Sequence, residues 1–184
     1  MTTPEVSILI VTWNNKGTVE RSIECARRAC RQIDHEILVW DNESHDGTAS
    51  LVANLLSPES LVRSLRNVGF AAGMNALARR ARGRHLFLLN PDAYLDETAV
   101  TEMLDVLKHL KLHGIVGGRL EGPDGDAQAA SARPFPTSWR TALWLIAQRN
   151  PYWWPLPTSA GDVDAVSGAF MAVPKDLWRA LEGF

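Results

Sequence analysis

Four strand-length apolar runs alternate with helical segments in the first half of the chain, and this alternation constrains the fold more than any other feature. The runs are VSILIVTW (6–13), EILVW (36–40), the weaker SLVRSL (60–65) and RHLFLL (84–89). Apolar strands that alternate with helices are typical of a mostly parallel sheet whose two faces are both covered. The sequence therefore predicts an α/β fold.

The helices are predicted from apolar residues that recur at helical spacing. The expected helical segments are 16–32, 49–56, 67–83 and a stretch after residue 96 that contains Val100, Met103, Leu104 and Leu107. Asp46 or Thr48 is expected near the start of the second helix and Asp96 at the start of the fourth, where side-chain oxygens accept from free N–H groups. Gly83 is expected to end the third helix.

The second half of the chain has a different pattern. The sequence PDG at 123–125 marks a turn between two short extended pieces, as in a hairpin. Residues 139–146 carry apolar side chains at helical spacing, and the strand-like FMAV (170–173) precedes a helix that opens at Pro174. With 184 residues and 46% hydrophobic residues, the chain has enough apolar material for one domain with a buried core.

Charge and hydropathy argue against general nucleic-acid binding, a membrane-spanning helix and a signal peptide. The formal net charge is -2 with both signs interspersed, so no general electrostatic attraction to nucleic acid is expected. No apolar run approaches the ~20 residues that a membrane-spanning helix needs. The N-terminus MTTPEVSILIVTWNN also lacks the basic segment and long apolar stretch of a signal peptide. We therefore expect a cytoplasmic protein.

The cysteines and one histidine pair were considered as metal or disulfide sites. Cys25 and Cys30 fall on one predicted helix, roughly 140° apart at 3.6 residues per turn, so we expect two buried free thiols. His109 and His113 have the i, i+4 spacing that can hold zinc on a helix. No third ligand is evident in the sequence, which favours a solvated helix end over a metal site.

Polar side chains follow three of the four predicted strands. The first strand is followed by Thr12, Trp13 and Asn14, the second by Asp41, Asn42, Glu43 and Ser44, and the fourth by Asn90, Pro91 and Asp92. Ligands of open α/β sheets bind beyond the carboxyl ends of the strands. Asn and Asp also serve as simple turn residues there, and Gly69 and Gly73 can serve close backbone packing, so each position taken alone leaves both interpretations open.

Five blocks in order carry a family resemblance. They are VSILIVTWNN (6–15), ILVWDNESHDGT (37–48), NVGFAAGMN (67–75), LLNPDAYL (88–95) and VSGAFMAV (166–173). Together they resemble the nucleotide-sugar-binding half of the family 2 inverting glycosyltransferases, nearest to the bacterial rhamnosyltransferase-like branch. The resemblance implies a GT-A-type, Rossmann-like three-layer sandwich over 1–184, with 1–113 as the nucleotide-sugar-binding half and 114–184 as the start of the acceptor-side half.

The resemblance also implies a donor site. The residues expected to line or border it are Thr12, Asn14, Asp41, Asn67, Gly69, Asn75 and Asn90. Asp41 is expected to hydrogen-bond the base of a dTDP- or UDP-linked donor. Ser167, Gly168 and Ala169 are expected on the acceptor side.

A divalent metal is part of the same expectation. Asn90-Pro91-Asp92 stands where the family has Asp-any-Asp, so Asp92 is the main carboxylate left for Mg²⁺ or Mn²⁺. A carboxylate and a diphosphate charge 4 Å apart repel by ~4 kcal/mol at an effective dielectric of 20, and a cation between them reverses the sign. Mg²⁺ often uses only one or two carboxylates together with phosphates and waters.

The implied activity is inverting transfer of rhamnose or a similar sugar to a surface-glycan or lipid-linked acceptor. Inversion needs a general base, which in the family follows a Gly-Phe-Asp-Glu-like stretch. This chain ends at Gly183-Phe184, so we expect it to stop short of the base, and we do not assign that role to Asp162 or Asp164. The alternative is a non-catalytic nucleotide-diphosphate-binding domain.

The Trp-rich segment around 139–154 leaves two interpretations open. Tryptophans with nearby Arg140 and Arg149 favour a peripheral contact with the inner face of the membrane or with a lipid-linked acceptor. Packing against further protein is the other interpretation. A nucleotidyltransferase is disfavoured, because no glycine-rich basic loop follows the first strand to hold a triphosphate.

Overall fold

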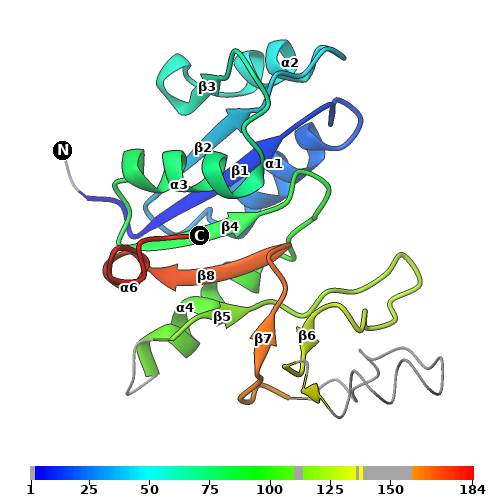
Figure 1. Ribbon diagram of the computed structural model, residues 1–184, viewed down its shortest axis with the longest axis vertical. Coiled ribbons are helices and arrows are strands. Elements are labelled where there is room, and N and C mark those ends of the chain that lie inside the picture. The colour runs from blue at the N-terminus through cyan, green and yellow to red at the C-terminus, as the bar shows by residue number, and fades with distance from the viewer. Residues whose placement is uncertain (1–2, 110–113, 136, 139–158) are drawn as a thin grey trace. The chain divides into compact units, whose positions relative to one another are not determined.

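The predicted alternation is present in the structure, a computed structural model that describes residues 3–109, 114–135, 137–138 and 159–184 (Figure 1). The elements in chain order are β1 (Val6–Thr12), α1 (Val19–Ala29), β2 (His35–Asp41), α2 (Thr48–Leu55), the 3-10 turn η1 (Pro58–Ser60), β3 (Leu61–Arg63), α3 (Phe70–Arg80), β4 (His85–Leu89), α4 (Ala99–His109), β5 (Val116–Gly117), β6 (Ala132–Arg133), β7 (Ala165–Val166), β8 (Phe170–Pro174) and α6 (Lys175–Ala180). Two compact units divide the chain, residues 1–116 with 168–184 and residues 117–167.

The main sheet has the strand order β3-β2-β1-β4-β8-β5. Strand β1 is parallel to β2 and to β4, and β2 is parallel to β3. Strand β8 runs antiparallel to β4, with Phe170 opposite Leu89 and Pro174 opposite His85. The predicted α/β fold with a mostly parallel central sheet is therefore confirmed.

The helices of the first unit cover both faces of this sheet. Helix α3 packs on β1 and β2 from one face, in front of the sheet in Figure 1, while α1 lies behind it and contacts α2 and α4. Right-handed crossovers explain the arrangement, because the chain passes from β1 outward to β3 and then returns through α3 to β4. The first unit therefore has the three expected layers, a central sheet with helices on each face.

The core sits against the inner strands. Strand β1 is buried at every position, and β4 is buried from Leu86 to Leu89. A strand that is buried on both faces needs an uninterrupted apolar run. Each large apolar side chain removed from water adds about 1.5–3 kcal/mol to the free energy of unfolding. Gly73 of α3 allows close packing here, since a Cβ at that position would lie 3.0 Å from Val11 Cγ2.

A buried polar network closes the amino-terminal end of the sheet. The Ser7 hydroxyl donates to Glu36 Oε1 at 2.7 Å and accepts from the Gly83 N–H at 2.8 Å. Glu36 also accepts from the backbone N–H of Arg82 at 2.5 Å and from its Nε at 2.9 Å. Burial alone raises the pKa of Glu36, but these hydrogen bonds from Arg82 and Ser7 hold it below the ordinary value of 4.5.

The predicted role of Gly83 as the end of a helix is wrong. Helix α3 ends at Arg80 with Ala81 as its C-terminal cap. Gly83 instead packs against β1, where a Cβ would lie 2.5 Å from the Ser7 nitrogen. Residue spacing could not reveal this role, because the contact joins segments about 75 positions apart in the chain.

The second unit contains short antiparallel pieces. Strands β6 and β7 pair antiparallel, and Glu121 forms an isolated antiparallel bridge with Ala127. Gly125, between them, has a φ of 81° and donates its N–H to the Gly122 carbonyl at 3.0 Å. The turn predicted at 123–125 is therefore confirmed, whereas the predicted helical face at 139–146 lies outside the described residues.

Other local predictions can also be compared with the structure. Cys25 and Cys30 are buried free thiols as expected, and burial raises the pKa of Cys30 to about 12. Asp96 accepts from the Thr98 N–H at 3.0 Å just before α4, as a residue at a helix start should.

The histidine pair considered as a metal site is only partly described: His109 is exposed, and His113 lies outside the described residues. Within the described part of the chain, no helix is long and apolar enough to cross a membrane.

Gly83→Ala is expected to destabilise the protein by about 3 kcal/mol. The added methyl group meets backbone atoms of β1 rather than a flexible side chain, and overpacking of this kind typically costs about 1–3 kcal/mol. Urea unfolding measures the change. Gly17→Ala is the matched control, since a Cβ there has open space around it, and its midpoint should stay close to wild type. Equal midpoints for the two variants would contradict the close packing.

Candidate functional site at the carboxyl rim of the sheet

The carboxyl ends of β1 and β2 meet at one level. Thr12 and Asp41 are register partners, and the Thr12 hydroxyl donates to Asp41 Oδ1 at 3.1 Å. The Ser44 N–H donates to Asp41 Oδ2 at 3.0 Å. Asp41 is only 3% exposed, so its carboxylate is held in a fixed orientation. A carboxylate has about four lone-pair positions, so acceptor capacity remains for a ligand.

The loops that leave β1 and β2 are joined to each other. The Asn14 N–H donates to Ser44 Oγ at 2.9 Å, and the His45 N–H donates to Asn14 Oδ1 at 2.8 Å. Asn14 and Glu43 have φ values of 56° and 65°, each two residues beyond the end of its strand. Left-handed backbone is costly for a non-glycine residue and is often found at functional sites. Glycine and asparagine are the usual residues in the left-handed region, so the positive φ of Glu43 could not be predicted from the sequence.

Asp46 makes a second connection between the same two loops. It accepts from the Lys16 N–H at 3.0 Å and from the Thr48 N–H and hydroxyl at 2.9 Å and 2.5 Å. The Thr48 hydroxyl in turn accepts from the Asn15 N–H at 2.9 Å. The Thr48 hydroxyl, helped by the Lys16 and Thr48 amides, lowers the pKa of Asp46 from 3.8 to about 2. The ionised carboxylate of Asp46 therefore accepts the hydrogen bonds that join these two loops.

The loop before α3 joins the same frame. The buried Asn42 side chain accepts from the Val68 N–H at 2.8 Å, and Glu43 accepts from the Asn67 N–H at 3.1 Å. Asn67 then accepts from the Gly69 N–H at 3.0 Å. Gly69 has a φ of 83° and lies in open space, so backbone conformation rather than close packing requires glycine here.

Asn75 does not contact this frame. It lies within α3, half-buried, and its amide pairs in both directions with the backbone of Phe184, at 3.1 Å each way. The Phe184 ring contacts those of Phe70 and Trp178, with centroids 5.9 Å and 5.0 Å away. The Asn75 amide is therefore hydrogen-bonded to Phe184 and not to the loops that carry the other expected donor-site residues.

The end of β4 presents the one free carboxylate among the expected site residues. Asn90 is anchored, because its N–H donates to the Ala169 carbonyl at 2.9 Å and its carbonyl accepts from the Ser22 hydroxyl at 3.3 Å. Asp92 is exposed, and its side chain has no hydrogen-bond or ion-pair partner among the described residues. Nearby, the Arg21 guanidinium lies 4.2 Å from the centre of the Tyr94 ring and fixes the loop to α1.

The expected acceptor-side residues fall in different parts of the structure. Ala169 holds Asn90, as described above, and Gly168 lies in the first unit in open space. Ser167 belongs to the second unit, where its N–H donates to the Ser131 carbonyl at 3.1 Å. In that unit Asp164 accepts from the Phe135 N–H at 3.0 Å, which supports its interpretation as a loop residue.

Trp13 is a further candidate that sequence reasoning placed at a strand end without giving it a role. It is 56% exposed although it directly follows a fully buried strand. An exposed indole face beside hydrogen-bonding groups can stack on a planar ring. The sequence shows only that a tryptophan directly follows an apolar strand, which is also compatible with a core residue. The exposed fraction in the structure shows that Trp13 is not part of the core.

The rim fits a divalent cation only in a limited way. Within the described residues, no group of three or more His, Cys, Asp or Glu side chains is positioned to hold a metal. A single free carboxylate such as Asp92 can still serve as an anchor for Mg²⁺ or Mn²⁺ when ligand phosphates and waters complete the oxygen shell. The arrangement therefore suits a metal that arrives with a phosphate-bearing ligand.

Comparisons with known proteins give a family match. The family model described as Glycosyl transferase family 2 matches residues 7–166. The chain is 31% identical over 103 residues to the succinoglycan biosynthesis protein ExoO of Rhizobium meliloti (strain 1021), which covers 55% of the chain and 29% of that protein.

Two solved structures share the fold. The mannosyltransferase PcManGT from Pyrobaculum calidifontis, in complex with GDP-Man and Mn²⁺, matches with a TM-score of 0.68 and 20% identity over 100% of this chain and 48% of that one. TarS 1-349 from S. aureus, in complex with UDP-GlcNAc, matches with a TM-score of 0.62 and 13% identity over 97% and 47% of the two chains. The chain spans less than half the length of each of these proteins.

Thr48→Val is expected to raise the pKa of Asp46 from about 2 toward 3.8, since it removes the largest cause of the shift. Because the folded-state pKa is the lower one, Asp46 stabilises the fold above about pH 4, and this contribution is lost as the pH falls to about 2. An NMR titration of the carboxyl carbon measures the pKa. Thr98→Val, which removes the equivalent bond to Asp96, is the control and should leave Asp46 unchanged. A pKa that stays near 2 in Thr48→Val would contradict the assignment.

Proposed function

The chain belongs to glycosyl transferase family 2, and on that premise we propose that its carboxyl rim binds a nucleotide-diphosphate sugar. The proposed reaction is inverting transfer of rhamnose or a similar sugar to a surface-glycan or lipid-linked saccharide acceptor. The observation that carries the proposal is the free, exposed carboxylate of Asp92 at the end of a buried strand, beside a rigid frame of hydrogen-bonding loops.

The base of the donor is proposed to lie over Thr12, Trp13 and Asp41. Asp41 is oriented by two hydrogen bonds and keeps acceptor capacity for a base N–H. Trp13 offers an exposed ring on which the base stacks. A dTDP- or UDP-linked donor is proposed, since Asp41 accepts the single ring N–H of thymine or uracil. The two similar structures are complexes with GDP-Man and with UDP-GlcNAc, so GDP belongs in any comparison of nucleotides.

The ribose and diphosphate are proposed to border Asn14, Asn67, Gly69 and Asn90. The loops that carry these residues are linked to one another or to neighbouring segments by hydrogen bonds from backbone N–H groups, so they need little ordering when a ligand binds. Asn75 is proposed only as a more distant border of the sugar, since its amide pairs with Phe184.

Asp92 is proposed to hold Mg²⁺ or Mn²⁺ against the donor diphosphate. A divalent cation there supplies positive charge that neutralises the departing diphosphate. The protein's part is to aim one carboxylate from the end of β4, with Pro91 restricting the turn and Asn90 anchored to the Ala169 carbonyl. Because Asp41 is already hydrogen-bonded and Asp92 is assigned to the metal, we propose no general base among the rim residues.

The wider assignment follows the sequence expectation. Residues 1–113 are proposed as the nucleotide-sugar-binding half and 114–184 as the beginning of the acceptor side, with Ser167, Gly168 and Ala169 near the acceptor. A cytoplasmic location, with peripheral contact at the inner face of the membrane through the Trp-rich segment, is also proposed. That segment lies outside the described residues.

Asp92→Asn is expected to weaken nucleotide-diphosphate binding about tenfold, and only when metal is present. The substitution removes the charge that anchors the cation, while the contacts to base and ribose remain. Calorimetric titration with UDP, dTDP and GDP, each in Mg²⁺, Mn²⁺ or EDTA, measures the effect.

Asp96→Asn is the matched control, because Asp96 is an exposed acid of the same loop that holds the start of α4. Its affinities should equal those of wild type. Asp41→Asn should weaken binding with or without metal. Binding that is absent under every condition, or Asp92→Asn and Asp96→Asn curves that coincide, would contradict the proposed site.

Trp13→Ala is expected to weaken nucleotide binding by roughly tenfold in both metal and EDTA, because stacking of one base contributes about 1–3 kcal/mol. Trp13→Phe keeps an aromatic face and should recover most of the affinity. The same titration measures both variants. If Trp13→Ala and Trp13→Phe bind equally well, the base does not stack on this residue.

A further inference from the structure

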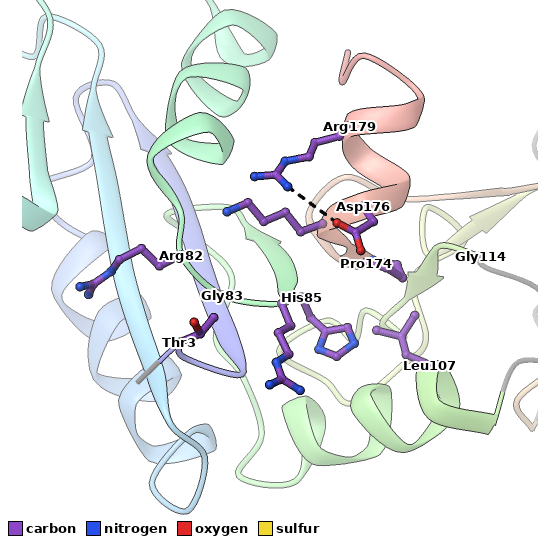
Figure 2. Close-up of a pocket in the computed structure, with 11 residues that line it drawn as sticks. Thr3, Arg82, Gly83, His85, Leu107, Gly114, Pro174, Asp176 and Arg179 are labelled. Carbon is purple, nitrogen blue, oxygen red and sulfur yellow. Dashed lines mark ion pairs between the residues drawn. The ribbon is translucent and has the colours of Figure 1, made fainter. Parts of the chain in front are cut away.

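A cavity of about 460 Å³ lies at the opposite end of the sheet from the carboxyl rim (Figure 2). It is built from the segments that precede β4 and follow β8, and it shares no residue with the candidate donor site. The volume falls in the range of about 300–1,000 Å³ that is typical of small-molecule sites. Its charged and polar lining residues include Arg82, Arg84, His85, Lys175, Asp176 and Arg179.

The cavity has more positive than negative charge. Asp176 is its one acidic lining residue, and it is exposed and lies 3.8 Å from Arg179, as the dashed line in Figure 2 shows. Arg82 points away from that pair and binds Glu36 at 2.9 Å. Neither Arg84 nor Lys175 forms an ion pair with an acid among the described residues, although Glu36 and Asp176 attract Lys175 from a distance.

Backbone pairing places Arg84 and Lys175 side by side. His85 is the antiparallel partner of Pro174, and the Lys175 N–H donates to the Arg84 carbonyl at 2.9 Å. The Lys175 ammonium donates to the Ala81 carbonyl, which keeps the side chain beside the cavity. Burial and the charge of Arg179 lower the pKa of Lys175, and the smaller attraction of Glu36 and Asp176 does not reverse the shift.

His85 adds a buried polar atom without a partner. Its Nδ1 is inaccessible to solvent and has no hydrogen-bond partner among the described residues. Buried polar atoms in folded proteins are nearly always hydrogen-bonded, so an unsatisfied one beside a cavity points to a ligand. Figure 2 shows the ring next to Leu107 at the cavity wall. Donation from Nδ1 to an oxygen of an anion requires the ring to turn toward the cavity, because this atom is covered in the present conformation.

We propose that this cavity binds the phosphate group of a phosphorylated ligand. Arg84 supplies a planar fork of donors that matches two phosphate oxygens, Lys175 supplies a point charge, and His85 supplies a third direction of donation. The same chemistry recognises a water-soluble phosphate ester and a phospholipid headgroup, and separate arms of one experiment distinguish these two sources.

The first arm titrates the full 184-residue chain with inorganic phosphate at constant ionic strength, followed by NMR. The double variant Arg84→Gln with Lys175→Gln is expected to raise the Kd at least tenfold. Arg79→Gln, which removes one positive charge from an exposed position of α3 outside the cavity, should bind like wild type. Lys175→Arg keeps the charge and should retain affinity. Equal Kd values for the double variant and Arg79→Gln would overturn the proposal.

The second arm measures co-sedimentation with vesicles of phosphatidylglycerol and, as a neutral comparison, phosphatidylcholine. Binding to phosphatidylglycerol that the double variant loses identifies a lipid headgroup as the source. Phosphate binding without vesicle binding identifies a soluble phosphate ester. If the wild-type chain binds neither phosphate nor phosphatidylglycerol vesicles, the proposal is overturned. UDP affinity should be the same in the double variant and wild type, so this outcome is separate from that of the donor site.

Discussion

The in-register parallel pairing of β1 and β2 is the constraint on which the rest of the molecule depends. It runs from Val6 opposite His35 to Thr12 opposite Asp41, so both strands end at one level and a buried hydroxyl meets a buried carboxylate. A slip of one residue would turn every side chain of a strand to the opposite face. The core packing of β1 and the position of Asp41 are therefore decided together.

The loops of the carboxyl rim are rigid because buried acceptors hold backbone N–H groups of their neighbours. Asp41 and Asn42 are buried and accept from loop amides, and leaving either side chain unpaired at that depth would cost about 1–3 kcal/mol. The exposed Asp46 adds acceptors for the Lys16 and Thr48 N–H groups. These bonds offset the strain at Asn14 and Glu43, about 1–2 kcal/mol each. Trp13 is exposed on this frame, and Asp92 is exposed after the neighbouring strand β4, so both side chains are free to meet a ligand.

The two ends of the sheet have different electrostatic character. The carboxyl rim presents acids and amides, whereas the amino end collects arginine and lysine around β4 and β8. The network of Ser7, Glu36 and Arg82 fixes the turn before β4, and with it the backbone of Gly83 and Arg84. The proposed nucleotide-sugar site uses the rim and leaves the basic cavity without a role.

The sequence by itself determined the strand and helix alternation, the α/β class and the convergence of polar residues after three strands, because hydrophobic periodicity and strand ends are local properties of the chain. The family membership was also visible in ordered sequence blocks. Only the tertiary structure decided that Gly83 packs on Ser7, that Asn75 pairs with Phe184, and that Arg84 lies beside Lys175. Each of these contacts joins segments far apart in the chain, and their meeting depends on strand order and orientation, which periodicity does not encode.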